Sequence, residues 1–330
     1  MKKHSAFTMI ELVMVIVVFG IVASIGAEII ASLYNNYLRT RAINRLQSQT
    51  ELTLEQIAKR LQYRIKDSVR ASNDGGATWV ALPSAVVGYD TIEWIGISNE
   101  SFLGEWDAAS ASVVPGWSGL IDMNDVNTSH ANRTLSTPGS RLDFANDIIK
   151  ALTNNGVAMD GTAGAQRPAL FFKGSKPGTF LNYYENATNI ANNPYARRVR
   201  CVNNDCTTNL TILQLNSNAA NDDLVDYDGD GDGDLFEQYY LSHTAYALEL
   251  ISTDLINLAN PQDFNLTFIY NYQPWEGETY VNGASQTLAE HVSTFRIRQE
   301  GDVVRIKLCI HDNDQSGDFD FSACKEKVIY

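Results

Sequence analysis

The chain has 330 residues, of which 44% are hydrophobic, and its formal net charge is −14. This length and apolar content suffice for a substantial core, while the acidity argues against direct binding of nucleic acid, a polyanion that needs a basic face. Twelve of the acids fall in residues 222–237 and 312–320, so the rest of the chain carries a net charge of only about −2.

The N-terminus combines a short basic leader with a long apolar run. Lys2 and Lys3 precede an almost wholly apolar segment at residues 7–33, which is long enough to cross a bilayer as a helix of about 20 residues. Glu11 interrupts this run, and a carboxylate at membrane depth costs about 2.5–3.5 kcal/mol or more unless it is paired. A secretory signal peptide and a generic signal anchor are the alternatives, and both leave Glu11 without a partner.

The sequence FTMIEL, followed by an apolar helix, resembles the leader of type IV prepilins and type II secretion system pseudopilins. The resemblance implies cleavage of a leader of residues 1–6 by prepilin peptidase between Ala6 and Phe7, then N-methylation of Phe7. It also implies that Glu11 pairs with the N-terminal amine of a neighbouring subunit, which neutralises an otherwise stranded carboxylate. Ala6 stands where the family usually has Gly, and Glu28 stands where major pilins often carry Pro, which favours a minor subunit.

Beyond residue 33 the helical pattern continues and becomes amphipathic. Apolar residues recur mainly at steps of three and four, and they form a stripe: Ile43, Leu46, Leu54, Ile57, Leu61, Ile65 and Val69. No Gly or Pro occurs in residues 27–74, and Gly75 and Gly76 then supply a stop. We therefore expect one helix from Thr8 to about Ser72, with a transmembrane half at 7–33 and an amphipathic half at 34–72 whose stripe packs on a β-sheet.

Residues 73–330 are expected to form a β-rich periplasmic domain. Apolar or alternating segments predict strands at 79–82, 91–97, 169–172, 246–251, 264–270, 292–298 and 303–309. Segments rich in Asn, Gly, Ser, Thr and Ala at 98–140, 153–167 and 174–200 are interpreted as surface insertions. The last two strands and their turn at 299–302 resemble the C-terminal hairpin of J-type pseudopilins and W-type minor pilins. The predicted fold is α+β: a long N-terminal helix packed on an antiparallel, β-rich, pilin-like domain with large loop insertions.

Residues 226–237 fit the calcium-loop pattern D-x-D-x-D-G-x5-E without a mismatch. Calcium takes six to eight oxygen ligands; alternate acids point inward, Gly231 permits the sharp turn, and the last Glu closes the shell. The predicted Ca²⁺ ligands are Asp226, Asp228, Asp230, Asp232, Asp234 and Glu237. The preceding segment is too rich in Asn, Asp and Ala for a convincing helix, so we expect a single EF-hand-like loop, with a flexible acidic loop as the alternative.

A second acidic segment matches the first half of the same pattern but has Ala323 at position 12. Its candidate calcium ligands are Asp312, Asp314, Ser316, Asp318 and Asp320. The alternative is an acidic hairpin stapled at its ends by the cysteines that flank it.

The four cysteines fall in the sequence as two short-range pairs, Cys201 with Cys206 and Cys309 with Cys324. Neither pair has CxxC spacing. No nearby His completes a convincing zinc site, so two disulfides in an oxidising compartment are expected, with four reduced, buried cysteines as the alternative.

The sequence contains no catalytic signature. Its histidines are scattered, and HExxH, GxSxG and phosphate-binding Gly loops do not occur, so we expect no catalytic residues and no enzymatic activity. The leading hypothesis is a single-pass inner-membrane subunit that primes a type IV pilus or type II secretion pseudopilus from its tip and is stabilised by Ca²⁺. The resemblance implies partners among other minor pilins or pseudopilins, the prepilin peptidase and the inner-membrane assembly platform. The alternative is a calcium-dependent adhesin or ligand-binding module displayed through a pilin leader.

Overall fold

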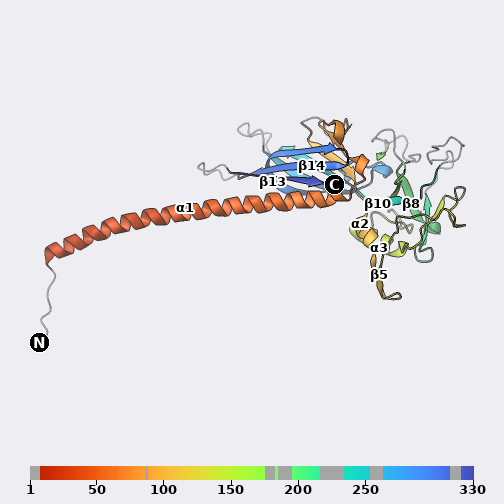
Figure 1. The fold of residues 1–330 in the computed structure, drawn as a ribbon, viewed down its shortest axis with the longest axis horizontal. Helices are drawn as coiled ribbons and strands as arrows, with labels where there is room; N and C mark the ends of the chain where they lie inside the picture. The colour runs from red at the N-terminus through yellow and green to blue at the C-terminus, as the bar shows by residue number, and fades with distance from the viewer. Residues whose placement is uncertain are drawn as a thin grey trace.

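The computed structural model describes residues 8–85, 88–174, 183–184, 195–215, 234–252, 263–312 and 321–330. One long helix leads into two large antiparallel sheets and a small two-stranded one (Figure 1). The α+β fold with a long N-terminal helix and an antiparallel β-rich domain is therefore confirmed. The described chain also has short 3-10 helices at Lys66–Ser68, Leu82–Ser84, Val202–Asn204, Pro274–Glu276 and Tyr280–Asn282.

The long helix, α1 (Met9–Gln62), has 54 residues and spans about 80 Å at 1.5 Å per residue. It ends at Gln62, so the prediction that it continues to about Ser72 was wrong. After Gln62 the backbone bonds to a strand: the Ile97 N–H donates to the Tyr63 carbonyl at 2.6 Å, and the Ile65 N–H donates to the Ile95 carbonyl at 2.9 Å. The apolar periodicity of the sequence continues to Ile65 because this side chain is buried in the adjoining core. The backbone of residues 63–65, however, hydrogen-bonds to residues 95–97 instead of continuing the helix.

The first sheet has eight strands in the order β15-β14-β13-β12-β11-β3-β1-β2, and every neighbouring pair is antiparallel. Its strands are β1 (Arg70–Ser72), β2 (Val80–Ala81), β3 (Thr91–Ile95), β11 (Ala245–Ser252), β12 (Phe264–Tyr272), β13 (Ala284–Glu300), β14 (Val303–His311) and β15 (Ser322–Ile329). The C-terminal half of α1 lies along this sheet (Figure 1).

The apolar stripe of α1 is the contact surface with the first sheet. Leu54, Ile57 and Leu61 are at most 4% exposed and share one core with strand residues such as Val304 and Ile306. Each such side chain contributes about 1.5–3 kcal/mol on full burial. The expectation that the stripe packs on a β-sheet is confirmed.

A second sheet has five strands in the order β10-β7-β8-β9-β6, again antiparallel throughout. Its strands are β6 (Thr134–Ser136), β7 (Ala169–Phe172), β8 (Arg197–Cys201), β9 (Ile212–Leu215) and β10 (Tyr239–Ser242). The neighbouring elements are α2 (Asn99–Leu103), α3 (Leu142–Leu152) and a small hairpin of β4 (Glu105–Asp107) and β5 (Ser112–Val114).

The second sheet has its own apolar core, in which Leu135, Ile149, Val199 and Leu213 are fully buried. Segments 98–140, 153–167 and 174–200 were expected to be surface insertions, and where the structure describes them they instead contribute strands and core residues to this unit. Their apolar residues are few and dispersed, so the core forms only when the strands come together.

A third buried cluster joins the two sheets. Within it the Arg70 guanidinium pairs with Glu93, which is 0% exposed, and lies 3.5 Å from the ring centroid of Tyr184. The Tyr272 hydroxyl donates to the second oxygen of the same carboxylate at 2.8 Å, and burial raises the pKa of Tyr272 well above its usual value. The ion pair and its hydrogen bond thus link β1, β3 and β12 within this cluster.

Candidate assembly helix and cation-binding segments

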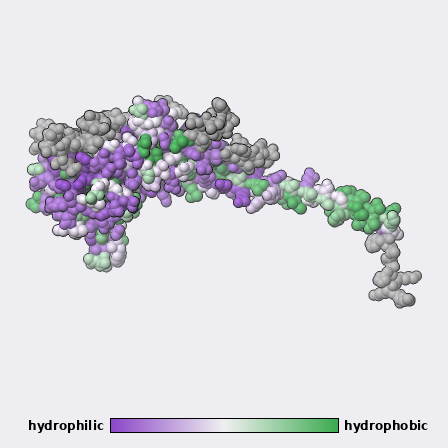
Figure 2. All heavy atoms as spheres, turned by 180° about the vertical axis from the view of Figure 1, so that it is seen from behind, coloured by the Kyte–Doolittle hydropathy of each residue, from purple (hydrophilic) through white to green (hydrophobic). Residues whose placement is uncertain are grey.

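The N-terminal half of α1 presents its apolar side chains to the surroundings rather than to a core. Its large hydrophobic residues from Met9 to Leu38 are between 42% and 85% exposed, and this end of the molecule is a continuous hydrophobic surface (Figure 2). Within the described residues, α1 is the one helix whose length and composition would let it span a bilayer. The arrangement is compatible with membrane anchoring and with packing of this half against other apolar helices.

Glu11 lies in the first turn of α1 among exposed apolar side chains. One of its carboxylate oxygens accepts hydrogen bonds from the Thr8 N–H at 3.0 Å and from the Thr8 hydroxyl at 2.8 Å. This contact caps the helix start, where free backbone N–H groups favour a negative charge. The carboxylate remains exposed on the isolated chain. Ala6 and Phe7 lie outside the described residues, so cleavage and methylation there stay predictions.

The first acidic segment connects β9 to β10 of the second sheet. Four predicted ligands, Asp226, Asp228, Asp230 and Asp232, lie outside the described residues. Asp234 and Glu237 are described, and the Glu237 carbonyl accepts a hydrogen bond from the Ile121 N–H at 2.8 Å. The exit of the segment is thus fixed to the second sheet, with the Glu237 side chain exposed. Calcium binding here stays a prediction.

The second acidic segment connects β14 to β15 at one end of the first sheet. Asp312 is described, and its N–H donates to the Phe321 carbonyl at 2.9 Å. The candidate ligands Asp314, Ser316, Asp318 and Asp320 lie outside the described residues, so a calcium site here also stays a prediction.

Both expected disulfides are present in the structure. Cys201 and Cys206 are bonded at the end of β8 with their Cα atoms 5.1 Å apart, and Cys309 and Cys324 are bonded between the paired strands β14 and β15. The alternative of four reduced cysteines is therefore not what the structure shows. The second disulfide closes the base of the second acidic segment.

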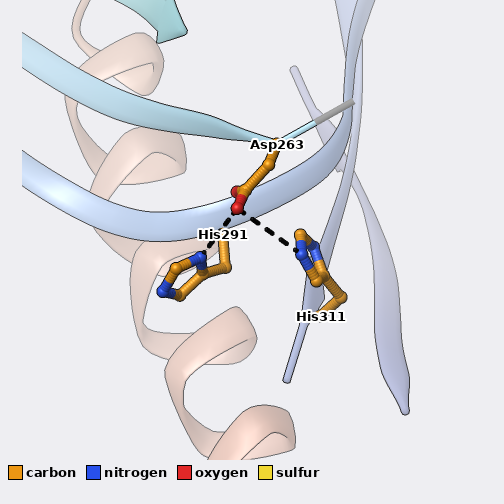
Figure 3. Close-up of side chains that lie close together, drawn as sticks. All are labelled: Asp263, His291 and His311. Atoms are coloured by element: carbon orange, nitrogen blue, oxygen red, sulfur yellow. Dashed lines mark hydrogen bonds and ion pairs between the residues drawn. The ribbon is translucent and has the colours of Figure 1, made fainter. Parts of the chain in front are cut away.

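Two histidines that the sequence analysis described as scattered lie together in the structure (Figure 3). His291 and His311 both face Asp263, and one nitrogen or oxygen atom from each residue lies within 4.8 Å of the other two. Sequence spacing gave no sign of this group, because His291 lies in β13, His311 ends β14 and Asp263 directly precedes β12.

Comparison with known proteins identifies the N-terminal segment. Residues 1–27 match the family model described as the prokaryotic N-terminal methylation motif. No curated protein and no solved structure matches the chain. The match covers the leader, the proposed cleavage point, Glu11 and the first turns of α1. The motif stands at the start of a long, exposed, apolar helix, and this combination is consistent with a prepilin-like precursor of the pilin or pseudopilin type.

Proposed function

We propose that this protein is a minor pilin or pseudopilin at or near the tip of a type IV pilus or a type II secretion pseudopilus, where it primes filament assembly. The observation that carries the proposal is the methylation motif followed by an apolar half-helix whose large side chains are exposed, unburied by any other part of the chain that the structure describes. Burial of that surface requires lipid before assembly and neighbouring helices after it. Assembly would then depend on the prepilin peptidase, the inner-membrane platform and other minor subunits.

The size and position of the second sheet support a place at the tip. This sheet lies beyond the C-terminal end of α1, on the side away from the N-terminus (Figure 1). In a filament of parallel helices, the space beyond that end is taken up by subunits further along the axis. A subunit at the tip has no such neighbour, so a bulky second sheet is accommodated there most easily.

Calcium would stabilise this subunit through the first acidic segment. The segment joins two strands of the second sheet, and its closely spaced carboxylates repel one another unless a cation lies between them. Binding of Ca²⁺ to the folded state alone would raise the free energy of unfolding.

The tip position can be tested by labelling. An epitope tag placed after Tyr330, which is 79% exposed at the end of β15, should be accessible to gold-labelled antibody on intact filaments. We expect gold at filament ends in electron micrographs, with a tagged major subunit labelled along the whole length as the control. Label spread evenly along filaments that contain this protein would contradict the tip position.

A second candidate function, that of a calcium-dependent adhesin or ligand-binding module, is favoured by an exposed apolar surface near α2 and the β4–β5 hairpin. Leu103, Trp106 and Val113 are 60–65% exposed there, and the hairpin projects from the second sheet (Figure 1). The acids between positions 226 and 234 can be substituted together to test this function. If the cells then lose surface binding but keep intact filaments, the result would favour this function over a purely structural one.

A further inference from the structure

Asp263, His291 and His311 meet at one end of the first sheet, on three strands that are hydrogen-bonded side by side. Asp263 directly precedes β12, His291 lies within β13, and His311 is the last residue of β14. Val292 pairs with Phe264 on one side and with Ile310 on the other, so the β13–β14 register sets His291 beside His311, while Asp263 reaches the two histidines diagonally from the neighbouring position. The two imidazoles face the Asp263 carboxylate between them (Figure 3).

The distances between these side chains suit a small divalent cation. His291 Nδ1 lies 3.0 Å from Asp263 Oδ2, and His311 Nε2 lies 3.8 Å from the same oxygen. Tetrahedral zinc, with bonds of about 2.0–2.2 Å to His nitrogen and carboxylate oxygen, holds its ligand atoms about 3.3 Å apart. The two spacings bracket this value, and all three ligand atoms lie within 4.8 Å of one another, so a metal ion could take the place of the hydrogen bond that now joins His291 to Asp263.

The environment of His311 independently supports a ligand at this position. The residue is 8% exposed, and neither of its ring nitrogens has a hydrogen-bond partner in the described structure. Buried polar groups are nearly always paired, because an unpaired one costs about 1–3 kcal/mol. Nε2 faces the Asp263 carboxylate at a distance too long for a hydrogen bond but suitable for a shared metal ion.

The backbone around His291 is adapted to this arrangement. His291 has a φ of +57°, in the left-handed region that non-glycine residues rarely adopt. The pairing of β13 with β14 shifts register between Val292 and Thr294, and bulges of this kind re-aim side chains. The His291 side chain is 31% exposed, so solvent can reach the cluster and a water molecule can complete the coordination shell.

We propose that Asp263, His291 and His311 bind one divalent transition-metal ion of the Zn²⁺ class. Two imidazoles and one carboxylate suit Zn²⁺ and its neighbours, whereas Ca²⁺ takes oxygen ligands alone. The site is therefore distinct in chemistry from the acidic segments. A bound ion would crosslink β12, β13 and β14 at one end of the sheet. At the same end the Arg39 guanidinium of α1 lies over the Phe321 ring.

The test is a metal titration of the full-length protein in detergent. The protein is first freed of metal with a chelator and is then kept in excess Ca²⁺, so that the acidic segments do not contribute to the Zn²⁺ binding that is measured. We expect calorimetry to show one equivalent of Zn²⁺ bound, and Co²⁺ to give the visible absorption bands of a tetrahedral nitrogen–oxygen site. His311→Gln should weaken Zn²⁺ binding about tenfold or more. His130→Gln is the matched control, because it makes the same change outside the cluster, and it should bind as the wild type does.

A second variant protects the test against misfolding of the first. His291→Asn removes a ligand at a partly exposed position, and Asn tolerates the left-handed backbone that His291 adopts. Circular dichroism of the metal-free proteins shows which variants are folded. Weakened Zn²⁺ binding and loss of the Co²⁺ bands in every variant that is folded support the site. No Zn²⁺ binding by the wild type, or wild-type affinity in His291→Asn, would overturn it.

Discussion

Glu11→Gln is expected to leave the protein in the membrane and to remove it from the filament. Glutamine keeps an oxygen that can accept the hydrogen bonds from Thr8, so the helix start is preserved, while the charge is lost. Without that charge the N-terminal amine of the neighbouring subunit would be buried unpaired. Breaking a buried ion pair costs about 3–5 kcal/mol, so incorporation should fall by about 100-fold or more.

Quantitative immunoblotting of membranes and of sheared filaments measures both parts of this prediction. Glu28→Gln is the matched control, since it removes the same charge from the same exposed apolar half of α1 but away from the helix start. It should be incorporated nearly as well as the wild type. Normal incorporation of Glu11→Gln, or an equal loss in both variants, would contradict a specific pairing of Glu11.

Removal of calcium is expected to lower the melting temperature of the full-length chain in detergent. If Ca²⁺ is present at about 100 times its dissociation constant, binding contributes about 2.7 kcal/mol to the free energy of unfolding. For domains of about 150–250 residues, 1 kcal/mol corresponds to about 2–4 °C, so chelation should lower the melting temperature by about 5–10 °C. Calcium added alone should restore it, as followed by circular dichroism.

Two variants place this calcium effect in the first acidic segment. Asp228→Asn removes a predicted ligand and should abolish most of the shift. Asp223→Asn makes the same change in charge outside the calcium-loop pattern and should keep the shift. A transition that is unaffected by chelation, or a full shift in Asp228→Asn, would contradict a stabilising calcium site at residues 226–237.

The long helix and the first sheet were largely predictable from the sequence. Strong alternation at 246–251, 264–270 and 303–309 corresponds to β11, β12 and β14, because each of these strands has one face against a continuous core. The residue at which α1 ends could not be predicted from apolar periodicity. Ile65 continues the helical stripe, but its burial comes from the junction between the sheets rather than from helix packing.

In the second sheet only β7 was predicted, at 169–172, and the other four strands were missed because they are short and mixed in polarity. β8 contains three arginines, and its apolar signal is confined to Val199 and Cys201, both fully buried. The same two-residue alternation occurs at Leu213 and Leu215 in β9, and at Tyr239 and Leu241 in β10. Each pattern is too short to predict a strand alone, and only tertiary packing makes them a core.

The histidine–aspartate cluster shows why part of a site can escape sequence reasoning. The regular part of the predicted hairpin pairs Glu300 with Val303, and continued without interruption it would place His291 opposite Asp312. The register shift between Val292 and Thr294 moves the pairing by one residue and sets His291 opposite His311 instead. A bulge of this kind carries no reliable sequence signal, so the cluster becomes visible only in three dimensions.

The most direct test of the account is mass spectrometry of the N-terminus of the protein isolated from its native membrane or filament. Processing as a prepilin predicts a chain that begins at a methylated Phe7, which would place its amine within reach of the Glu11 carboxylate of a neighbouring subunit. A mature chain that still carries residues 1–6, or one cut beyond Ala23, would contradict assembly through this segment.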